Sequence, residues 1–330
     1  MSDITLVTGG AGFAGRHLVS ALRARGERVR IFDLAAPAEE SDIQGSVTDA
    51  EAVGKAMNDV RSVFHLAGNA QLWSRKARDF DRVNRGGTEI VAEAALKAGV
   101  ERFVYCSSLT TLVGKNTPIG ESMADESIML QADDMLGAYP RSKRMGEQAV
   151  EAAALKGLNA VIALPTEPLG PGDADLTPPT RMILDFLNGD TPAYIDCILN
   201  FVPVKSLAEG LIASRDRGRM HGRYLLGGEN VPMRRLLETL ERLSGRPMPK
   251  KRMPYAVAFA AGVIDTGLVA RLTGEQPKAP LTGVRLAGRQ VSFTSEKAAR
   301  ELGWRAAPFE DALAAAIEWL RDRGMLKARS

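Results

Sequence analysis

The sequence predicts an α/β fold in which a doubly wound parallel sheet is followed by a smaller, irregular α+β part. Up to about residue 165, short apolar runs alternate with amphipathic helical segments, a pattern typical of a parallel sheet with helices on both faces. Beyond that point the regular segments become shorter. We therefore expect one unit over residues 1–165 and a second over residues 166–330, with some segments of the second returning to the first.

The composition is that of an ordinary globular protein. Of 330 residues, 45% are hydrophobic and 25% are charged, which supports a full core. The net charge of +3 is spread along the chain without a basic block, so the composition gives no support for nucleic-acid binding. Cys106 and Cys197 lie in apolar segments, which is typical of buried free thiols in a reducing compartment.

Targeting and metal signals are missing from the sequence pattern. The N-terminus leads directly into a strand pattern, and the longest apolar run, Ala256 to Ile264, is too short to cross a bilayer. The three histidines lie far apart, without metal-ligand spacing. We therefore expect a cytoplasmic protein with no integral membrane segment and no metal.

The first strand and helix enclose a glycine-rich turn. Ile4 to Val7 are apolar enough for a buried strand, and Arg16 to Arg25 continue as an amphipathic helix. Between them, Gly9 permits a tight turn, Gly12 allows close approach of a pyrophosphate, and Gly15 lets helix and strand pack closely. The N–H groups and the dipole at the start of the helix favour an anion. The pattern predicts a dinucleotide-binding site.

The second strand, Val29 to Phe32, ends in Asp33. An acid at this position accepts hydrogen bonds from the adenosine ribose and repels a 2′-phosphate, so it favours NAD over NADP. The alternative is a solvated acid at a strand end.

The rest of the first part continues the alternation. The expected elements are a strand end and capped helix at Gly45 to Asp49, a strand at Val63 to Leu66 that breaks at Ala67-Gly68, a helix from Asn84 to Ala98, a strand from Arg102 to Cys106, a helix from Tyr139 to about Leu155, and a strand from Asn159 to Leu164 closed by Pro165. His65 lies inside an apolar strand, so a hydrogen-bonded core histidine is favoured over a catalytic one.

Tyr139 and Lys143 are four residues apart and share one helix face. A tyrosine hydroxyl titrates near ~10, and an ammonium at ~4 Å in an effective dielectric of ~20 supplies about 4 kcal/mol, or roughly three pKa units. Tyr139 would then titrate near ~7, where a general acid/base works best. Ser108 would orient the substrate oxygen, with Thr110 as the alternative. Lys143 would also hold the nicotinamide ribose.

The second part carries fewer chemical signals. We expect a loop at Gly170 to Asp173, helices at Arg181 to Asn188, Met233 to Ser244, Lys297 to Leu302 and Glu310 to Asp322, an extended stretch at Phe201 to Val204, and a strand at Arg223 to Leu226. The apolar segment from Tyr255 to Val269 lines a pocket or packs in the core. Three arginines are candidates for contacts with phosphates: Arg181, Arg285 and Arg289.

The motifs above resemble the extended short-chain dehydrogenase/reductase family over nearly the whole chain. The matching pieces, in order, are Gly9-Gly10-Ala11-Gly12-Phe13-Ala14-Gly15, Asp33, His65-Leu66-Ala67-Gly68, Asn84 with Gly87-Thr88, Ser107-Ser108, Tyr139 with Lys143, and Gly170-Pro171-Gly172-Asp173. Stretches at 132–139, 180–185 and 192–196 are similar to hopanoid-associated sugar epimerases and dihydroflavonol reductases, and 139–147 is similar to 3β-hydroxysteroid dehydrogenases.

The resemblance implies a Rossmann-type fold that binds NAD and a small-molecule substrate. It supports Ser108, Tyr139 and Lys143 as catalytic residues, and a homodimer through the helices that contain Asn84 and Tyr139. The cofactor-binding residues that motifs and resemblance give together are Gly9, Gly12, Phe13, Ala14, Asp33, Ser46, Val47, Leu66, Ala67, Gly68, Asn84, Cys106, Ser107, Tyr139, Lys143, Pro165 and Thr166.

The chain also departs from the family pattern. Gly45-Ser46 stands where many relatives have Gly-Asp, which removes an adenine contact. Val202-Pro203-Val204-Lys205-Ser206 replaces Val-His-Val-Asp-Asp, and Leu164-Pro165 replaces the Arg-Pro of many sugar-nucleotide members.

Three functions follow from these patterns. The favoured one is an NAD-dependent oxidoreductase that acts on an alcohol or ketone of a small, fairly apolar molecule, terpenoid- or steroid-like. The second is a sugar or nucleotide-sugar epimerase or dehydratase that recycles its NAD. The third, a non-catalytic NAD-binding regulator, is disfavoured by the intact Ser108, Tyr139 and Lys143.

Overall fold

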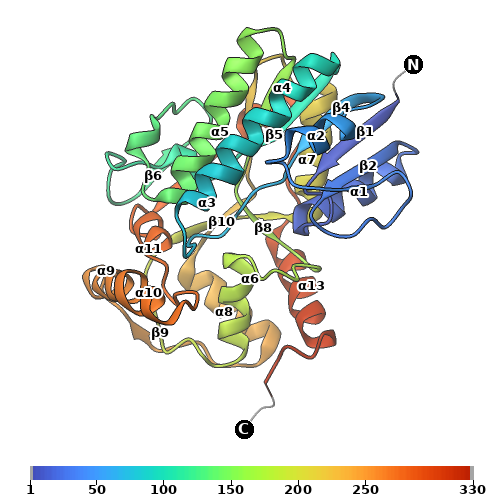
Figure 1. The fold of residues 1–330 in the computed structure, drawn as a ribbon. Coiled ribbons are helices and arrows are strands. Elements are labelled where there is room, and N and C mark those ends of the chain that lie inside the picture. The colour runs from blue at the N-terminus through green and yellow to red at the C-terminus, as the bar shows by residue number, and fades with distance from the viewer. Residues whose placement is uncertain (1–2, 328–330) are drawn as a thin grey trace.

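The computed structural model describes residues 3–327, and a seven-stranded parallel sheet forms its centre (Figure 1). In spatial order the strands are β11 (Arg223–Leu226), β7 (Ala160–Pro165), β5 (Arg102–Cys106), β4 (Val60–His65), β1 (Ile4–Thr8), β2 (Arg28–Asp33) and β3 (Ile43–Gln44). The order reverses between β1 and β4, and ligands of such sheets bind outside the carboxyl ends of the strands at this point. The predicted parallel sheet is confirmed.

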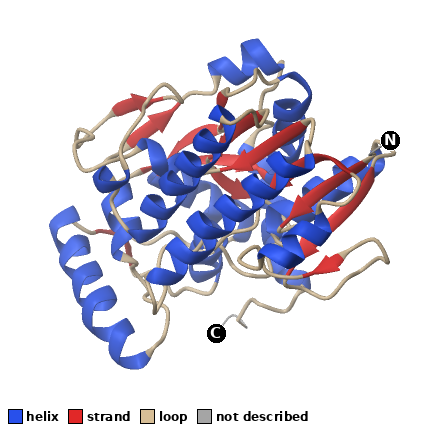
Figure 2. Ribbon diagram, turned by 45° about the horizontal axis from the view of Figure 1, so that its top comes forward, coloured by secondary structure: helices blue, strands red, loops and turns tan. Residues whose placement is uncertain are grey.

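Helices cover both faces of this sheet (Figure 2). One face packs against α1 (Phe13–Ala24), α7 (Val204–Arg217) and α12 (Glu296–Leu302). The other packs against α2 (Ala50–Ala56), α4 (Thr88–Ala98) and α5 (Ala138–Leu155). Because both faces are covered, the strand residues on each face are apolar and buried, which explains the continuous apolar runs in the sequence. The doubly wound fold is confirmed.

The helix predicted from Asn84 to Ala98 begins earlier. It starts with α3 (Arg78–Phe80), continues as a π-helical turn η1 (Asp81–Gly87) and runs on into α4. Its first turns carry charged residues, among them the partly exposed Asp79 and Asp81, which stabilise a helix N-terminus without producing an apolar period. The apolar pattern therefore marked only the buried part of the helix.

The second part packs around its own core. A three-stranded sheet contains β8 (Glu167–Leu169), β10 (Ile198–Pro203) and β12 (Glu229–Pro232), and α6 (Pro178–Leu187), α8 (Met233–Ser244) and α13 (Phe309–Asp322) pack beside it. Two short pairs complete the strands: β9 (Ala193–Tyr194) with β13 (Lys251–Arg252), and β6 (Ser122–Ala124) with β14 (Val291–Phe293). Two 3₁₀ turns, η2 (Leu109–Leu112) and η3 (Ala132–Asp134), precede α5.

Helix α7 was not predicted. The sequence pattern indicated only an extended stretch up to Val204, but β10 ends at Pro203 and the helix begins at the next residue. Its buried side chains, including Leu207 and Leu211, pack on the main sheet. Together with β11 and α12, α7 brings the C-terminal half of the chain back to the first unit.

One long helix lies at the edge of the molecule. It consists of α9 (Tyr255–Ile264), the π-helical turn η4 (Asp265–Val269) and α10 (Ala270–Thr273), and α11 (Leu281–Ala287) returns beside it (Figure 1). The apolar run from 256 to 264 is only part of this helix. The helix is longer than the run predicted, because it continues through Asp265 to Thr273. Over 19 residues it is long and apolar enough to cross a membrane by length and composition alone, and a single such helix is weak evidence that it does.

Candidate active site

The glycine-rich turn lies at the carboxyl end of β1. Gly9 has φ +73°, and a Cβ there would lie 2.6 Å from the Ala67 nitrogen. A Cβ at Gly15 would lie 2.0 Å from the Gly9 oxygen. Gly12 is less crowded, with the same oxygen at 3.3 Å, and α1 starts directly after it with neither a side-chain cap nor an acid in its first turn. The first helical N–H groups are therefore available to an anion, and the turn fits a pyrophosphate.

Phe13 and Ala14 form the first turn of α1. The Phe13 ring meets the His17 ring edge-on, with centroids 5.8 Å apart. His17 Nε2 lies 2.9 Å from the Pro171 oxygen, and the Arg16 guanidinium donates to the Gly172 oxygen at 2.6 Å. The start of α1 is thereby held against the loop that the sequence analysis identified at Gly170 to Asp173.

Asp33 holds the glycine turn from the end of β2. Its carboxylate accepts hydrogen bonds from the backbone N–H of Ala11 at 3.0 Å and of Ala35 at 3.1 Å. Each carboxylate oxygen keeps a second lone pair, so a ribose hydroxyl could still donate to it. A negative charge placed here opposes a 2′-phosphate, and the site fits NAD.

The segment after β4 lies against the glycine turn. The backbone N–H of Leu66 donates to the Thr8 oxygen at 3.0 Å, and that of Ala67 donates to the Thr8 hydroxyl at 3.3 Å. Gly68 lies so close to Asn84 that a Cβ would come within 2.9 Å of the Asn84 side-chain oxygen. The structure therefore brings Leu66, Ala67 and Gly68 to the edge where the dinucleotide is expected.

Ser46 and Val47 follow β3. The Ser46 hydroxyl pairs with that of Thr48 at 2.8 Å, while Val47 is buried and packs on Gly87. The Val47 side chain thus belongs to the core. Asp49 caps α2, because its carboxylate accepts hydrogen bonds from the backbone N–H groups of the first turn.

His65 is a core residue, as predicted. Its Nδ1 lies 2.7 Å from the Thr8 hydroxyl and its Nε2 lies 2.9 Å from the Thr88 hydroxyl. The ring stacks on that of Tyr105, and burial lowers the pKa of His65 to about 3. The imidazole is neutral and both nitrogens have partners.

Asn84 connects the segment after β4 to α5. Its side-chain oxygen accepts from the Asn69 N–H at 2.7 Å, and its side-chain nitrogen donates to the Asn69 oxygen at 3.0 Å and to the Ser142 hydroxyl at 2.9 Å. Ser142 in turn donates to the Tyr139 oxygen at 2.8 Å. Both amide hydrogens of Asn84 are used within the protein, so it positions the start of α5. The sequence analysis assigned no role to Asn69 or Ser142, although Ser142 lies between Tyr139 and Lys143.

The structure brings Ser108 and Tyr139 together. Both are buried, and the Ser108 hydroxyl lies near enough to the Tyr139 phenol to offset part of the rise that burial causes in the pKa of Tyr139. Thr110 contacts Ser108, since its hydroxyl donates to the Ser108 hydroxyl at 3.0 Å. Of the two alternatives, Ser108 is therefore the one in contact with Tyr139.

Lys143 lies on the same helix but points elsewhere. Its ammonium donates to the Cys106 oxygen at 2.6 Å and lies 4.7 Å from the centre of the Tyr105 ring. Burial lowers the pKa of Lys143, and burial raises the pKa of Tyr139 to about 12. The expected value near ~7 for Tyr139 is wrong for this geometry. Loss of water around the phenol outweighs the stabilisation of its anion, and Lys143 is directed at the carbonyl.

A buried carboxylate that the sequence analysis did not single out supports these residues. Glu147, on α5, accepts hydrogen bonds from the hydroxyls of Ser107 and Thr111, the latter at 2.7 Å. The guanidinium groups of Arg144 and Arg223 donate to its other oxygen at 3.1 Å and 3.0 Å. The Ser107 hydroxyl thus faces α5, and Glu147 connects the ends of β5 and β11 to the helix that carries Tyr139.

Two polar atoms after β7 have no protein partner in the described range 3–327. They are the hydroxyl oxygen of Thr166, directly after Pro165, and one carboxyl oxygen of Glu167. Burial raises the pKa of Glu167 to about 8, so this carboxyl is protonated and can donate a hydrogen bond at neutral pH. Both atoms are available to a bound molecule. Glu167 gave no sequence signal, because its burial depends on the tertiary fold.

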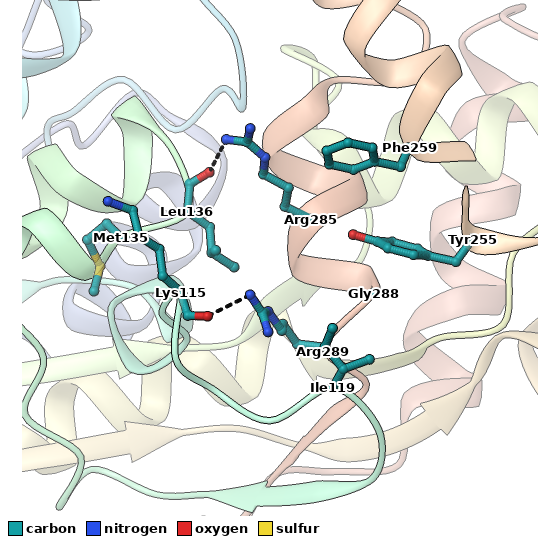
Figure 3. A pocket seen from close by; sticks show the side chains of 9 residues that line it. All are labelled: Lys115, Ile119, Met135, Leu136, Tyr255, Phe259, Arg285, Gly288 and Arg289. Carbon is teal, nitrogen blue, oxygen red and sulfur yellow. Dashed lines mark hydrogen bonds between the residues drawn. The ribbon is translucent and has the colours of Figure 1, made fainter. Parts of the chain in front are cut away.

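A pocket of about 280 Å³ lies beside the segment that leads into α5 (Figure 3). It is lined by Lys115, Ile119, Met135, Leu136, Tyr255, Phe259, Arg285, Gly288 and Arg289. Arg285 donates to the Leu136 oxygen at 3.4 Å, and Arg289 donates to the oxygens of Thr117 and Lys115 at 2.6 and 2.8 Å. These two arginines hold loops in place, which weakens their interpretation as phosphate ligands. Within residues 3–327, no cluster of three His, Cys, Asp or Glu side chains could bind a metal.

Comparisons with known proteins agree with this geometry. A model of the NAD dependent epimerase/dehydratase family matches residues 5–195. The chain is similar to a Synechocystis protein named as a dihydroflavonol 4-reductase, at 32% identity over 100% of this chain and 98% of that protein. It is 31% identical to sterol demethylase protein B of Methylococcus capsulatus, over 98% of this chain and 99% of that protein. The crystal structure of gox2253 superposes with a TM-score of 0.83 at 32% identity, covering 98% of this chain and 100% of that one. The chain therefore belongs to the NAD-dependent epimerase/dehydratase family of extended short-chain dehydrogenases/reductases and is an NAD-dependent enzyme.

Proposed function

We propose that the protein transfers hydride between NAD and an alcohol or ketone of a small, fairly apolar molecule, terpenoid- or steroid-like. The observation that carries this proposal is that the buried Ser108 and Tyr139 hydroxyls lie near each other, Ser108 following β5 at the carboxyl edge of the sheet and Tyr139 in the first turn of α5. A hydroxyl pair in this position can bind one oxygen of a carbinol or ketone.

Each residue has a role in that chemistry. NAD, when bound, supplies or accepts the hydride. The Tyr139 phenol, kept protonated by its burial, donates its proton to a ketone oxygen, and Ser108 donates a second hydrogen bond that orients this oxygen. Lys143 keeps two further N–H groups beyond the one bonded to Cys106, enough to hold a ribose hydroxyl. In the reverse direction the phenolate must form, and the positive charge of an oxidised nicotinamide would favour it.

Three observations support an apolar substrate. The pocket wall formed by Tyr255, Phe259 and Leu136 is largely apolar. Arg285 and Arg289 already donate to backbone oxygens, which leaves fewer donors for a sugar diphosphate. The names of two relatives, sterol demethylase protein B and dihydroflavonol 4-reductase, refer to polycyclic molecules and not to sugar nucleotides.

The decisive experiment follows NADH absorbance with apolar ketones and, separately, with sugar nucleotides. We expect NADH consumption in proportion to ketone reduced. Tyr139→Phe should lower kcat by 100-fold or more, on the order of a lost general acid, with little change in NADH binding. Tyr194→Phe, which removes a phenol hydroxyl from β9, is the matched control and should retain full activity. Conversion of a sugar nucleotide without net change in NADH would instead support a recycled cofactor and an epimerase.

We also propose a homodimer formed through α4 and α5, located in the cytoplasm. The resemblance to the family supports the first, and the two free cysteines, Cys106 and Cys197, support the second. Sedimentation velocity at micromolar concentration should show a dimer, and a monomer would remove this interface. Cell fractionation with thiol titration should recover the protein with both thiols reduced.

A further inference from the structure

The long edge helix from Tyr255 to Thr273 carries many exposed apolar side chains. Seven of the thirteen large exposed hydrophobic side chains in residues 3–327 lie on it: Tyr255, Val257, Val263, Ile264, Leu268, Val269 and Leu272. Leu272 is 78% exposed and Ile264 57%. A helix with this much exposed apolar surface is normally covered by protein or by lipid, and only 17% of the 18-residue apolar window of this helix is buried in the fold.

Two polar side chains in the middle of the same helix bond to the neighbouring segment of the protein. The carboxylate of Asp265 accepts a hydrogen bond from the Ala279 N–H at 2.9 Å, and the hydroxyl of Thr266 accepts one from the Leu281 N–H at 2.9 Å. Its closest approaches to the protein use small residues, Ala258 and Gly262. The arrangement of a normal surface helix is therefore reversed, with bonded polar groups inside and apolar groups outside.

Basic residues flank the apolar face at both ends. Lys250, Lys251 and Arg252 precede the helix, Arg271 lies in its last turn, and Arg75 from another loop lies against Gly274. From residue 250 to 278 there are five basic and two acidic residues, a net charge of +3 that equals the net charge of the whole chain. Within the described residues, Lys250, Lys251 and Arg271 make no ion pair, whereas Arg252 pairs with Asp196.

We propose that this helix lies flat on an anionic lipid bilayer, with its apolar face among the acyl chains and its basic flanks at the headgroups. Nineteen residues make a cylinder about 28 Å long, which suits an interfacial helix. Basic residues next to such a helix are attracted to anionic lipids. The inference goes beyond the proposed function and does not depend on it.

Two other arrangements fit the observations less well. A helix that crosses the bilayer would have to break the bonds of Asp265 and Thr266 to the 279–281 loop and leave α11. A second copy of the chain, packed antiparallel on the same face, would place the basic ends of the two helices next to each other. A lipid surface satisfies both the apolar face and the charge.

The test is sedimentation of the full chain with large vesicles of phosphatidylcholine alone or with about one-third phosphatidylglycerol. We expect binding that is at least 10-fold stronger with the anionic vesicles. The double variant Leu268→Glu/Leu272→Glu should lose this binding, and Lys250→Glu/Lys251→Glu should lose the preference for anionic vesicles. Met220→Glu is the matched control, because Met220 is 61% exposed in the turn before β11, and it should bind like the wild type.

Folding of each variant is checked by NADH binding, which uses residues outside this helix. Ile264→Trp keeps the apolar face and gives a second readout, since its fluorescence should shift to shorter wavelength when anionic vesicles are added. Wild-type protein that stays in the supernatant with both vesicles, or a Leu268→Glu/Leu272→Glu variant that binds normally, would overturn the proposal. A dimer that this double variant converts to monomer, without vesicle binding by the wild type, would show that a second copy covers the face.

Discussion

Polar and apolar side chains are placed in opposite ways in two regions, the carboxyl edge of the main sheet and the α9–α10 helix. At the sheet edge, Asn84, Glu147 and His65 are buried, and each is hydrogen-bonded to several partners from different elements. On α9–α10, the polar groups bond inward while leucines and valines remain outside. In the first region, buried polar groups hold the side chains of the candidate site in position. The second leaves apolar surface for a contact outside the chain.

The largest expected effect is at Glu147. Glu147→Ala leaves the buried guanidinium of Arg223 without its partner, and removing one member of a buried ion pair costs about 3–5 kcal/mol. Urea denaturation followed by circular dichroism measures the free energy of unfolding. Glu238→Ala, which breaks the exposed pair with Arg234 on α8, is the control and should leave the free energy unchanged. Equal effects of the two substitutions would contradict the role of Glu147 as a buried ion-pair partner.

The second effect concerns pH and His65. Its pKa is about 3 in the folded protein and about 6.5 when unfolded, so between these values the unfolded chain binds more protons. The contribution of His65 to the free energy of unfolding is therefore fully present above about pH 6.5. It falls as the pH decreases, by up to about 1.4 kcal/mol per pH unit. His65→Gln should flatten this part of the stability curve. An identical pH dependence in the variant would show that other groups cause it.

A smaller effect is expected at Asp33. Asp33→Ala removes the negative charge beside the glycine turn and the hydrogen bond to the Ala11 N–H, so NAD binding should weaken and the preference for NAD over NADP should narrow by roughly 10-fold, or about 1.4 kcal/mol. Isothermal titration with NAD and with NADP measures the ratio of the two dissociation constants. Asp3→Ala removes an acid before β1 and should leave it unchanged. A wild type that already prefers NADP would contradict the assignment.

The smallest effect is at Leu272. Because this side chain is mostly exposed, Leu272→Gln should change the free energy of unfolding by less than about 0.5 kcal/mol, whereas Leu22→Ala, in the buried face of α1, should cost about 2–5 kcal/mol. Thermal and urea denaturation in the absence of lipid measure both. A large loss at Leu272 would mean that the helix face is covered within the protein.

Sequence patterns predicted the parts of the fold that local chemistry determines. The glycine turn, the strand ending at Asp33 and the helix that opens near Tyr139 each carry a short-range signal, and the structure contains all three. The predictions failed where tertiary contacts decide. Helix α7 begins directly after Pro203, in a stretch that resembles a strand, and η4 continues the edge helix through Asp265 because a loop from residue 279 satisfies that carboxylate.

The same distinction applies to the candidate site. The spacing of Tyr139 and Lys143 placed them on one helix face. It gave no information about the loss of water around the phenol, which raises the pKa of Tyr139, or about the Cys106 carbonyl, to which Lys143 donates. Glu167 and Glu147 were missed for the same reason, since an acid acquires its role from burial and from its partners.

The rings of Tyr255 and Phe259 belong to the edge helix and also line the pocket beside α5. A helix that rests on lipid would therefore form a shared wall between bilayer and pocket. An oily ketone partitions into the bilayer, so the enzyme would meet it at its density in the membrane plane and not at its concentration in water. The enzyme's apparent KM would then depend on the mole fraction of ketone in the lipid. Adding ketone-free vesicles would lower that mole fraction and raise the KM expressed as total ketone.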